Sequence, residues 1–330
     1  MVDTPLDAFL SCLGARLPAP WEKALALCRR RAASFRGDTM AVLERPLGGG
    51  PPALDFSVRL EEAGQCLDGA ALPAAAAALF AARGGGEFPA AWLPAIWLEY
   101  DLRLGADRKP IACFRVGAEA PGEWWRQWLL PRLGSGLPES SLRLVTAALE
   151  QLPAETRPLY FFDLSARGAP GLRCELAAEP AHVRGWLAAI GAAPQAAQLE
   201  RLATLWKDGD RPHLSLDFGA DGWRPRVGLE NSFRGQPPAE DRWRAQLESL
   251  VEAGLAAAEE VEPLLAWPAV QTPAAVTDWP KDAAGKKSPG WLVSCLSHLK
   301  LASSPGEKIE AKAYLLFQYL RREVRVWPSR

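Results

Sequence analysis

Polar and apolar residues alternate along several short segments of the chain, most clearly near its C-terminus. Because side chains of a strand point alternately to its two faces, such a segment is predicted to be a strand with one apolar and one polar face. In the last two segments, leucines and alanines share one face, while His298 and Lys300, and then Lys312 and Tyr314, share the other. These two predicted strands, Leu292–Ala302 and Ile309–Phe317, are joined by a turn at Ser303–Gly306. The hairpin therefore directs two lysines and a tyrosine into one space.

The same alternation recurs earlier in the chain, between turns rich in glycine and proline. In 213–219, for example, Leu214, Leu216 and Phe218 alternate with polar residues. The other predicted strands are Leu54–Glu61, Ala95–Leu104, Pro110–Val116, Pro158–Ala166, Gly171–Ala177 and Arg224–Phe233.

Segments with helical periodicity lie between these strand pairs. They are residues 3–36, Leu72–Arg83, Gly122–Leu133, Ser140–Leu152, Pro180–Ile190, Pro194–Trp206, Asp241–Gly254 and Glu259–Ala266. The order helix, helix, strand, strand is clear in units 122–177, 180–233 and 241–319, and two less regular units precede them. We therefore predict a single domain, 1–330, of about five such units.

Tight hairpins joined by helices favour an α+β fold, an antiparallel sheet with its helices on one face. Each apolar strand face can pack on the helices, which leaves one shared polar face. About ten strands could remain an open curved sheet or close into a barrel with a polar lumen, ringed by the helices. The pattern alone leaves both forms open.

Composition adds mainly exclusions. The 330 residues are 48% hydrophobic and 23% charged, with a formal net charge of −1, which gives no reason to expect nucleic acid or an anionic membrane as a partner. No apolar run approaches the length of a membrane span, and the N-terminus lacks the basic region of a signal peptide. Six scattered cysteines without ligand spacing are expected to be reduced, buried thiols, and the expected location is cytoplasmic.

The repeated units, with polar residues pointing inward, resemble the ABBA-type prenyltransferases. The local likenesses are Asp163-Leu164-Ser165, the strand Leu172–Leu176 and Lys312-Ala313-Tyr314. The resemblance implies a barrel that holds an isoprenoid diphosphate and an aromatic or peptide acceptor, with Lys-x-Tyr or Arg-x-Lys pairs on several strands binding the diphosphate. It also leaves room for Mg²⁺ arriving with the diphosphate; no metal-binding residues are predicted.

The chain departs from that pattern in two ways. Lys-x-Tyr occurs once, and the matching positions on other strands carry Arg173/Glu175 and Arg226/Gly228/Glu230, where a glutamate is a poor neighbour for a diphosphate. With four tyrosines in the chain, Trp97 or phenylalanines would have to replace part of the aromatic shield.

Under the barrel interpretation, the inward-facing cations converge on an anionic ligand. Glu99 is the candidate general base for an aromatic acceptor, and His298 is either a proton carrier or a structural histidine. The predicted substrate-binding residues are Arg59, Arg115, Arg173, Arg226, His298, Lys300, Lys312 and Tyr314. The alternative is that these cations form interior salt bridges with glutamates and bind nothing.

Three function classes follow, of which the third is a structural or partner-binding role if Trp124, Trp125 and Trp128 of the predicted helix Gly122–Leu133 form an exposed patch. The first is a prenyltransferase-like enzyme, and the second is a non-catalytic barrel that binds a small molecule or peptide in a biosynthetic pathway. Excess positive charge in the lumen favours the first, and paired arginine and glutamate residues favour the second. The chain has no Walker A, GxGxxG, HExxH, GxSxG or DDxxD motif that would direct the prediction elsewhere.

Overall fold

The structure is a computed structural model and describes most of the chain. The described residues are 6, 10, 22–36, 39–49, 54–67, 72–102, 109–168, 170–206, 209–276, 279, 286–287 and 289–320.

All the strands of this part of the chain belong to one antiparallel sheet. Its order is β11-β1-β2-β3-β4-β5-β6-β7-β8-β10-β9, and β10 also pairs with β11, so ten strands close into a barrel and β9 is added outside the ring. The strands are β1 (Ala41–Pro46), β2 (Asp55–Leu60), β3 (Ile96–Tyr100), β4 (Ile111–Arg115), β5 (Arg157–Asp163), β6 (Gly171–Ala177), β7 (His213–Gly219), β8 (Gly222–Asn231), β9 (Ala269–Gln271), β10 (Trp291–Ser303) and β11 (Glu310–Leu320).

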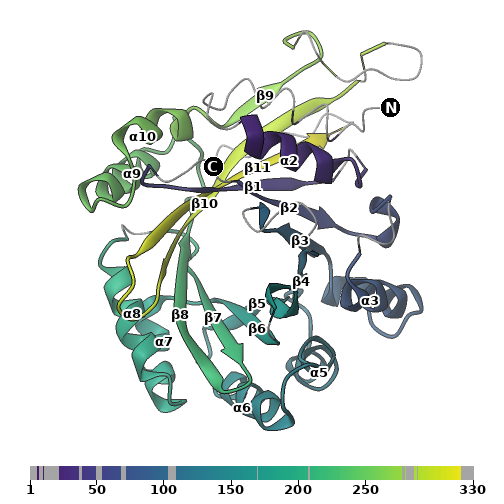
Figure 1. Cartoon of the computed structure of the whole chain (residues 1–330), viewed down its shortest axis with the longest axis vertical. Coiled ribbons are helices and arrows are strands. Elements are labelled where there is room, and N and C mark those ends of the chain that lie inside the picture. The colour runs from purple at the N-terminus through teal and green to yellow at the C-terminus, as the bar shows by residue number, and fades with distance from the viewer. Residues whose placement is uncertain are drawn as a thin grey trace.

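The helices lie outside the ring of strands (Figure 1). They are α2 (Glu22–Ala32), α3 (Ala74–Gly84), α4 (Gly122–Trp124), α5 (Leu130–Leu133), α6 (Glu139–Glu150), α7 (Pro180–Ala189), α8 (Ala193–Ala203), α9 (Arg242–Glu252) and α10 (Ala258–Leu265). A π-helical turn, Trp125–Leu129, joins α4 to α5. The apolar strand faces and the helices form the main core, in which Phe56, Phe218 and Trp243 are fully buried.

The α+β antiparallel barrel predicted from alternation is confirmed, and the closed form is the one adopted. The strand pairs of the last three units lie within three residues of their predicted bounds, and β6 and β7 match them at both ends. Within the described residues, the helical prediction for 3–36 is met at α2 and at the isolated positions Leu6 and Leu10. The alternation did not predict β1 or β9.

Strand β1 is the element that closes the barrel. It pairs with β2 on one side and with β11 on the other, where Leu43 lies opposite Leu315 and Glu44 opposite Tyr314. Five of its six residues are buried. A short segment that is buried on both faces and carries charge on both lacks the simple alternation of the other strands, and this is why the pattern missed it.

Within the described residues, no helix combines the length and apolar character needed to cross a lipid bilayer. The five described cysteines are all buried.

Replacing Phe317 of β11 with alanine is expected to lower the free energy of unfolding by about 3–5 kcal/mol, because its ring is fully buried between the sheet and the helices. Urea-induced unfolding followed by tryptophan fluorescence measures the change. Leu144→Ala is the control, since this side chain is 47% exposed and its removal should change stability by no more than about 0.5 kcal/mol. Similar losses in both variants would contradict the assigned orientation of β11.

Candidate functional site

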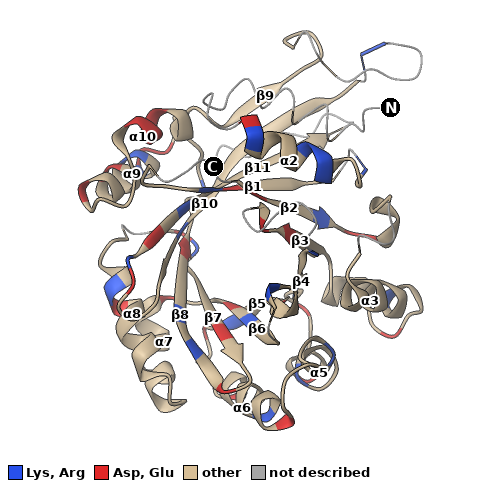
Figure 2. Cartoon of the chain, viewed as in Figure 1, with Lys and Arg blue, Asp and Glu red and all other residues tan. Residues whose placement is uncertain are grey.

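The barrel contains a cavity of about 560 Å³. Its volume lies within the range of about 300–1,000 Å³ typical of small-molecule sites. The lining residues come from strands all around the ring: Met40, Val42, Ser57, Arg59, Trp97, Glu99, Cys113, Arg115, Tyr160, Phe162, Arg173, Glu175, Arg211, His213, Glu230, Ser232, Ser297, His298, Lys300, Tyr314 and Leu316. Positions of both charge signs lie along the strands (Figure 2).

One wall of the cavity is aromatic. Phe162 and Cys113 belong to a small apolar cluster inside the barrel, separate from the main core, against which Trp97 and Tyr160 pack. Trp97 lies opposite Cys113 across β3 and β4, and Cys113 lies opposite Phe162 across β4 and β5, so one row of the lumen is apolar. On another side of the cavity, Tyr314 stacks on His298 with ring centroids 4.0 Å apart.

The antiparallel ring gives the barrel two different ends. We call the end where β2, β4, β6 and β8 finish and β1, β3, β5 and β7 begin the first rim, and the opposite end the second rim. Arg59 and Arg115 lie in the last two residues of β2 and β4, and Arg211 lies two residues before β7. Three arginines of the cavity lining therefore lie at the first rim.

These three arginines differ from the deeper cations in their partners. Arg59 pairs with Glu61, whose side chain is 61% exposed, at 3.0 Å. Arg115 and Arg211 are exposed and, among the described residues, face no carboxylate within ion-pair distance. The first rim therefore offers guanidinium groups that an anionic ligand could contact without breaking a buried pair.

Glu99 lines the cavity from β3, opposite Ser57 of β2. Arg167 donates a hydrogen bond to its Oε1 from 2.8 Å, and the Glu99 side chain is 15% exposed. The arrangement holds a carboxylate within reach of the lumen and gives it a charged partner at the second rim.

Arg173 and Asp217 form a buried, bidentate ion pair across β6 and β7, with N–O distances of 2.6 and 3.0 Å. Burial alone would raise the pKa of Asp217, but the Arg173 guanidinium holds it below its usual range. Burial likewise opposes the charge of Arg173, and the Asp217 carboxylate outweighs it, so the pKa of Arg173 is raised. The guanidinium of Arg173 is thus already satisfied.

The two lysines of the final hairpin are paired in the same way. Lys300 donates to Glu230, which lies directly opposite on β8, and to Ser215 at 3.1 Å. Lys312 donates to Glu44 of β1. Burial would raise the pKa of Glu44, yet the ammonium group of Lys312 holds it well below its usual range.

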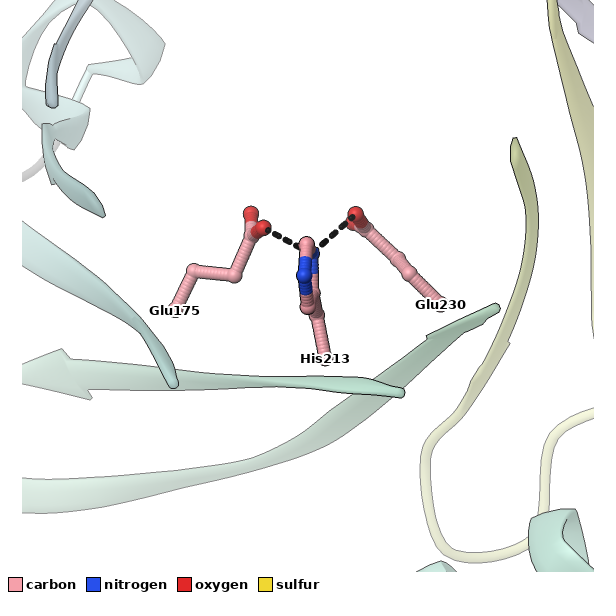
Figure 3. A group of neighbouring side chains, drawn as sticks. All are labelled: Glu175, His213 and Glu230. Carbon is pink, nitrogen blue, oxygen red and sulfur yellow. Dashed lines mark hydrogen bonds and ion pairs between the residues drawn. The ribbon is translucent and has the colours of Figure 1, made fainter. Parts of the chain in front are cut away.

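A second group of side chains gathers near the first rim: Glu175, His213 and Glu230, from β6, β7 and β8 (Figure 3). Burial and the neighbouring Glu230 carboxylate raise the pKa of Glu175. Burial would lower the pKa of His213, but its hydrogen bond to Glu175 raises it. His298, 3.4 Å from Glu230, behaves differently, because burial lowers its pKa to about 4.

Seven of the nine site residues predicted from the sequence line this one cavity: Arg59, Glu99, Arg115, Arg173, His298, Lys300 and Tyr314. The other two lie elsewhere. Lys312 borders a separate cavity of about 770 Å³ at the second rim, and Arg226 pairs with the half-exposed Glu310 at 2.7 Å. The six predicted cations therefore do not all line one cavity.

Sequence reasoning missed Arg211, Tyr160 and Phe162 as lining residues. Arg211 could have been found, because the alternation of His213, Ser215 and Asp217 extends back to it. Tyr160 and Phe162 could not, since their strand is apolar on both faces and shows no alternation.

Known proteins give a consistent answer about the fold. No protein-family model matches the sequence, and a search of curated proteins finds no relative. Solved structures do match. The prenyltransferase PriB, in a ternary complex with L-tryptophan and dimethylallyl thiolodiphosphate, aligns with a TM-score of 0.53 and 17% identity over 94% of this chain and 96% of that chain. AnaPT from Neosartorya fischeri aligns with a TM-score of 0.50 and 12% identity over 97% and 92%.

The chain has the prenyltransferase-barrel fold. The expected resemblance to ABBA-type prenyltransferases is thereby confirmed at the level of architecture, over nearly the full length of both chains. At these identities, the chemistry of this prenyltransferase-like barrel has to be argued from its own residues.

Replacing Asp217 with alanine is expected to lower the free energy of unfolding by about 3–5 kcal/mol, because it leaves the buried guanidinium of Arg173 without a partner. Chemical denaturation measures the loss. The matched control is Glu310→Ala, which breaks a half-exposed ion pair with Arg226 and should cost no more than about 1 kcal/mol. Equal losses of unfolding free energy in the two variants would contradict this expectation, because the buried pair would then contribute no more than the half-exposed one.

The Glu44–Lys312 pair is expected to make stability depend on pH. Because the pKa of Glu44 is lower in the folded chain than in the unfolded chain, the pair stabilises the fold above the unfolded pKa, and this contribution is lost as pH falls. Glu44→Gln should therefore be less stable than the wild type at neutral pH, by a margin that shrinks below about pH 4. Unfolding at a series of pH values tests this, and a constant margin would argue against it.

Proposed function

We propose that this chain is an enzyme that transfers an isoprenoid group from a diphosphate donor to an aromatic acceptor inside the barrel. The observation that carries the proposal is the composition of the lumenal cavity. It combines an aromatic wall, a carboxylate at Glu99, and the exposed Arg115 and Arg211 at one open end. Prenyl transfer needs all three kinds of group in one enclosed space.

The donor diphosphate is placed at the first rim, on Arg59, Arg115 and Arg211. Guanidinium groups match the geometry of phosphate oxygens, and none of these three has a buried carboxylate partner among the described residues. Arg173 and Lys300 lie deeper and are held by Asp217 and Glu230, so they are not available for direct contacts with the donor. Mg²⁺ bound with the diphosphate would add further charge compensation.

The isoprenoid chain is placed along the aromatic wall. When the C1–O bond of the donor breaks, its electron pair leaves with the diphosphate and an allylic cation remains. The π-faces of Trp97, Tyr160, Phe162 and Tyr314 would stabilise this cation and keep water from it.

The acceptor ring attacks the cation and forms a new bond to the prenyl carbon. The proton displaced from the ring, or from its NH group, then passes to the carboxylate of Glu99, which Arg167 keeps in position. The ligands named for the PriB structure, L-tryptophan and dimethylallyl thiolodiphosphate, support an acceptor of amino-acid size and a short donor. A peptide acceptor would present its aromatic side chain through the first rim.

A second candidate function is binding without catalysis. The observation that favours it is the pairing of the deep cations with Asp217, Glu230 and Glu44, which leaves little excess positive charge in the interior. In this case the same cavity would hold a small organic anion for another protein of the pathway.

The test combines calorimetry with a product assay. The purified chain is titrated with dimethylallyl thiolodiphosphate and incubated with dimethylallyl or geranyl diphosphate and L-tryptophan, with and without Mg²⁺. We expect a prenylated product by mass spectrometry. Arg115→Ala should weaken donor binding about 10- to 100-fold, because a charged hydrogen bond is lost. Arg226→Ala, whose side chain lies outside the cavity, should bind normally.

Glu99→Gln separates the two candidates. For the enzyme it should lower kcat by about 100-fold or more while leaving donor affinity unchanged. Donor binding without product, with L-tryptophan and other aromatic acceptors, would favour the binding protein. Absence of donor binding, together with absence of product from either diphosphate, would reject prenyl transfer.

A further inference from the structure

Glu175, His213 and Glu230 place one nitrogen between two carboxylates (Figure 3). The Nδ1 atom of His213 lies 3.1 Å from Oε1 of Glu175 and 4.0 Å from Oε2 of Glu230. The three potential ligand atoms all lie within 4.8 Å of one another. Both carboxylates are buried, and the imidazole is partly buried.

The register of the sheet fixes this arrangement. His213 lies directly opposite Glu230 across β7 and β8. Glu175 lies opposite Ser215, two residues along β7 from His213, so it is the diagonal neighbour of the histidine on the same face. All three side chains therefore point into the lumen from three adjacent strands, and none depends on a loop for its position.

The charges around the cluster are unevenly shared. Glu230 binds Lys300 through Oε1, and its other oxygen, Oε2, faces His213 and also lies 3.4 Å from Nε2 of His298. Glu175 has His213 as its partner and, among the described residues, no lysine or arginine within ion-pair distance. Lys300 thus pairs with only one of the two buried carboxylates, and the side that faces His213 has no lysine or arginine among the described residues.

We propose that Glu175, His213 and Glu230 form a binding site for one divalent transition-metal ion of the Zn²⁺ type. Ligand atoms of a tetrahedral site with bonds near 2.0–2.1 Å are about 3.3 Å apart. The observed 3.1 and 4.0 Å separations approach that value, and a small rotation of the Glu230 side chain closes the difference. Lys300 on the outer oxygen of Glu230 is the kind of partner that orients a carboxylate ligand.

The donor set selects the class of metal. Imidazole nitrogen with two carboxylates suits first-row transition metals, whereas Mg²⁺ prefers octahedral oxygen ligands and retains its water. Three protein ligands in a cavity wall also leave a coordination position open towards the lumen, as in catalytic rather than structural zinc sites. The ion could there accept an oxygen from a phosphate or carboxylate in the cavity. The inference does not depend on prenyl transfer.

The test uses the full chain after metal has been removed with a chelator. Zn²⁺ is titrated in competition with a chromophoric chelator, and Mg²⁺ is titrated in parallel. We expect one Zn²⁺ per chain, a far weaker response to Mg²⁺, and X-ray absorption that shows nitrogen and oxygen ligands without sulfur. Sulfur ligands would assign the ion to a cysteine such as Cys113 and overturn the proposal.

Variants locate the site. His213→Ala and Glu175→Gln should each weaken Zn²⁺ binding by at least about 100-fold, since the loss of even an outer partner of a metal ligand costs about 10- to 100-fold. The matched control is His182→Ala, which removes an exposed histidine of α7 and should bind as the wild type does. Circular dichroism establishes whether each variant is folded. If His213→Ala does not fold, Glu175→Gln alone tests the site.

Three results would overturn the proposal. The first is a folded wild-type chain that retains no Zn²⁺. The second is Zn²⁺ binding at wild-type affinity in both His213→Ala and Glu175→Gln. The third is an equal loss of affinity in His182→Ala, which would show that histidines elsewhere bind the ion.

Discussion

The pairing of β1 with β11 is the contact on which the lumen depends. Without it, β1 and β11 would be free edges, and the polar strand faces would be an open surface rather than the wall of a cavity. The closing strand is fixed on both of its faces by residues distant in sequence. Glu44 bonds Lys312 inside the barrel, and the next residue, Arg45, bonds Glu260 of α10 outside it at 3.0 Å. Charge therefore reinforces backbone pairing where the ring must close.

Closure also decides what the interior charges can do. Inside a low-dielectric wall, an unpaired charge is costly, so the deep cations lie directly across the sheet from carboxylates: Arg173 from Asp217 and Lys300 from Glu230. Such pairs stabilise one register of the strands. A ligand that took over either cation would leave a buried carboxylate uncompensated. The groups most available to a ligand are consequently those at the open end of the cavity, and not the most buried ones.

Alternation predicted which way a side chain points but not how deep it lies. It correctly placed His298, Lys300 and Tyr314 on the lumenal face. It also gave Arg173 and Arg226 the same inward direction, yet one is buried in the wall and the other lies near the second rim with Glu310. Depth follows from the stagger between strands, which a single sequence does not display. The convergence of Glu175, His213 and Glu230 likewise depends on register across three strands.

The two rims differ in a way that bears on function. At the second rim, Arg226 and Arg167 are engaged by Glu310 and Glu99. At the first rim, Arg115 and Arg211 are exposed, and the carboxylates of Glu175 and Glu230 lie inside them around His213. An anion that enters here first meets the positive charge of the arginines. A cation bound by the two carboxylates would reduce their repulsion of that anion. Arginines at the rim and carboxylates further inside therefore suit a bound molecule that combines an anion with a divalent metal ion.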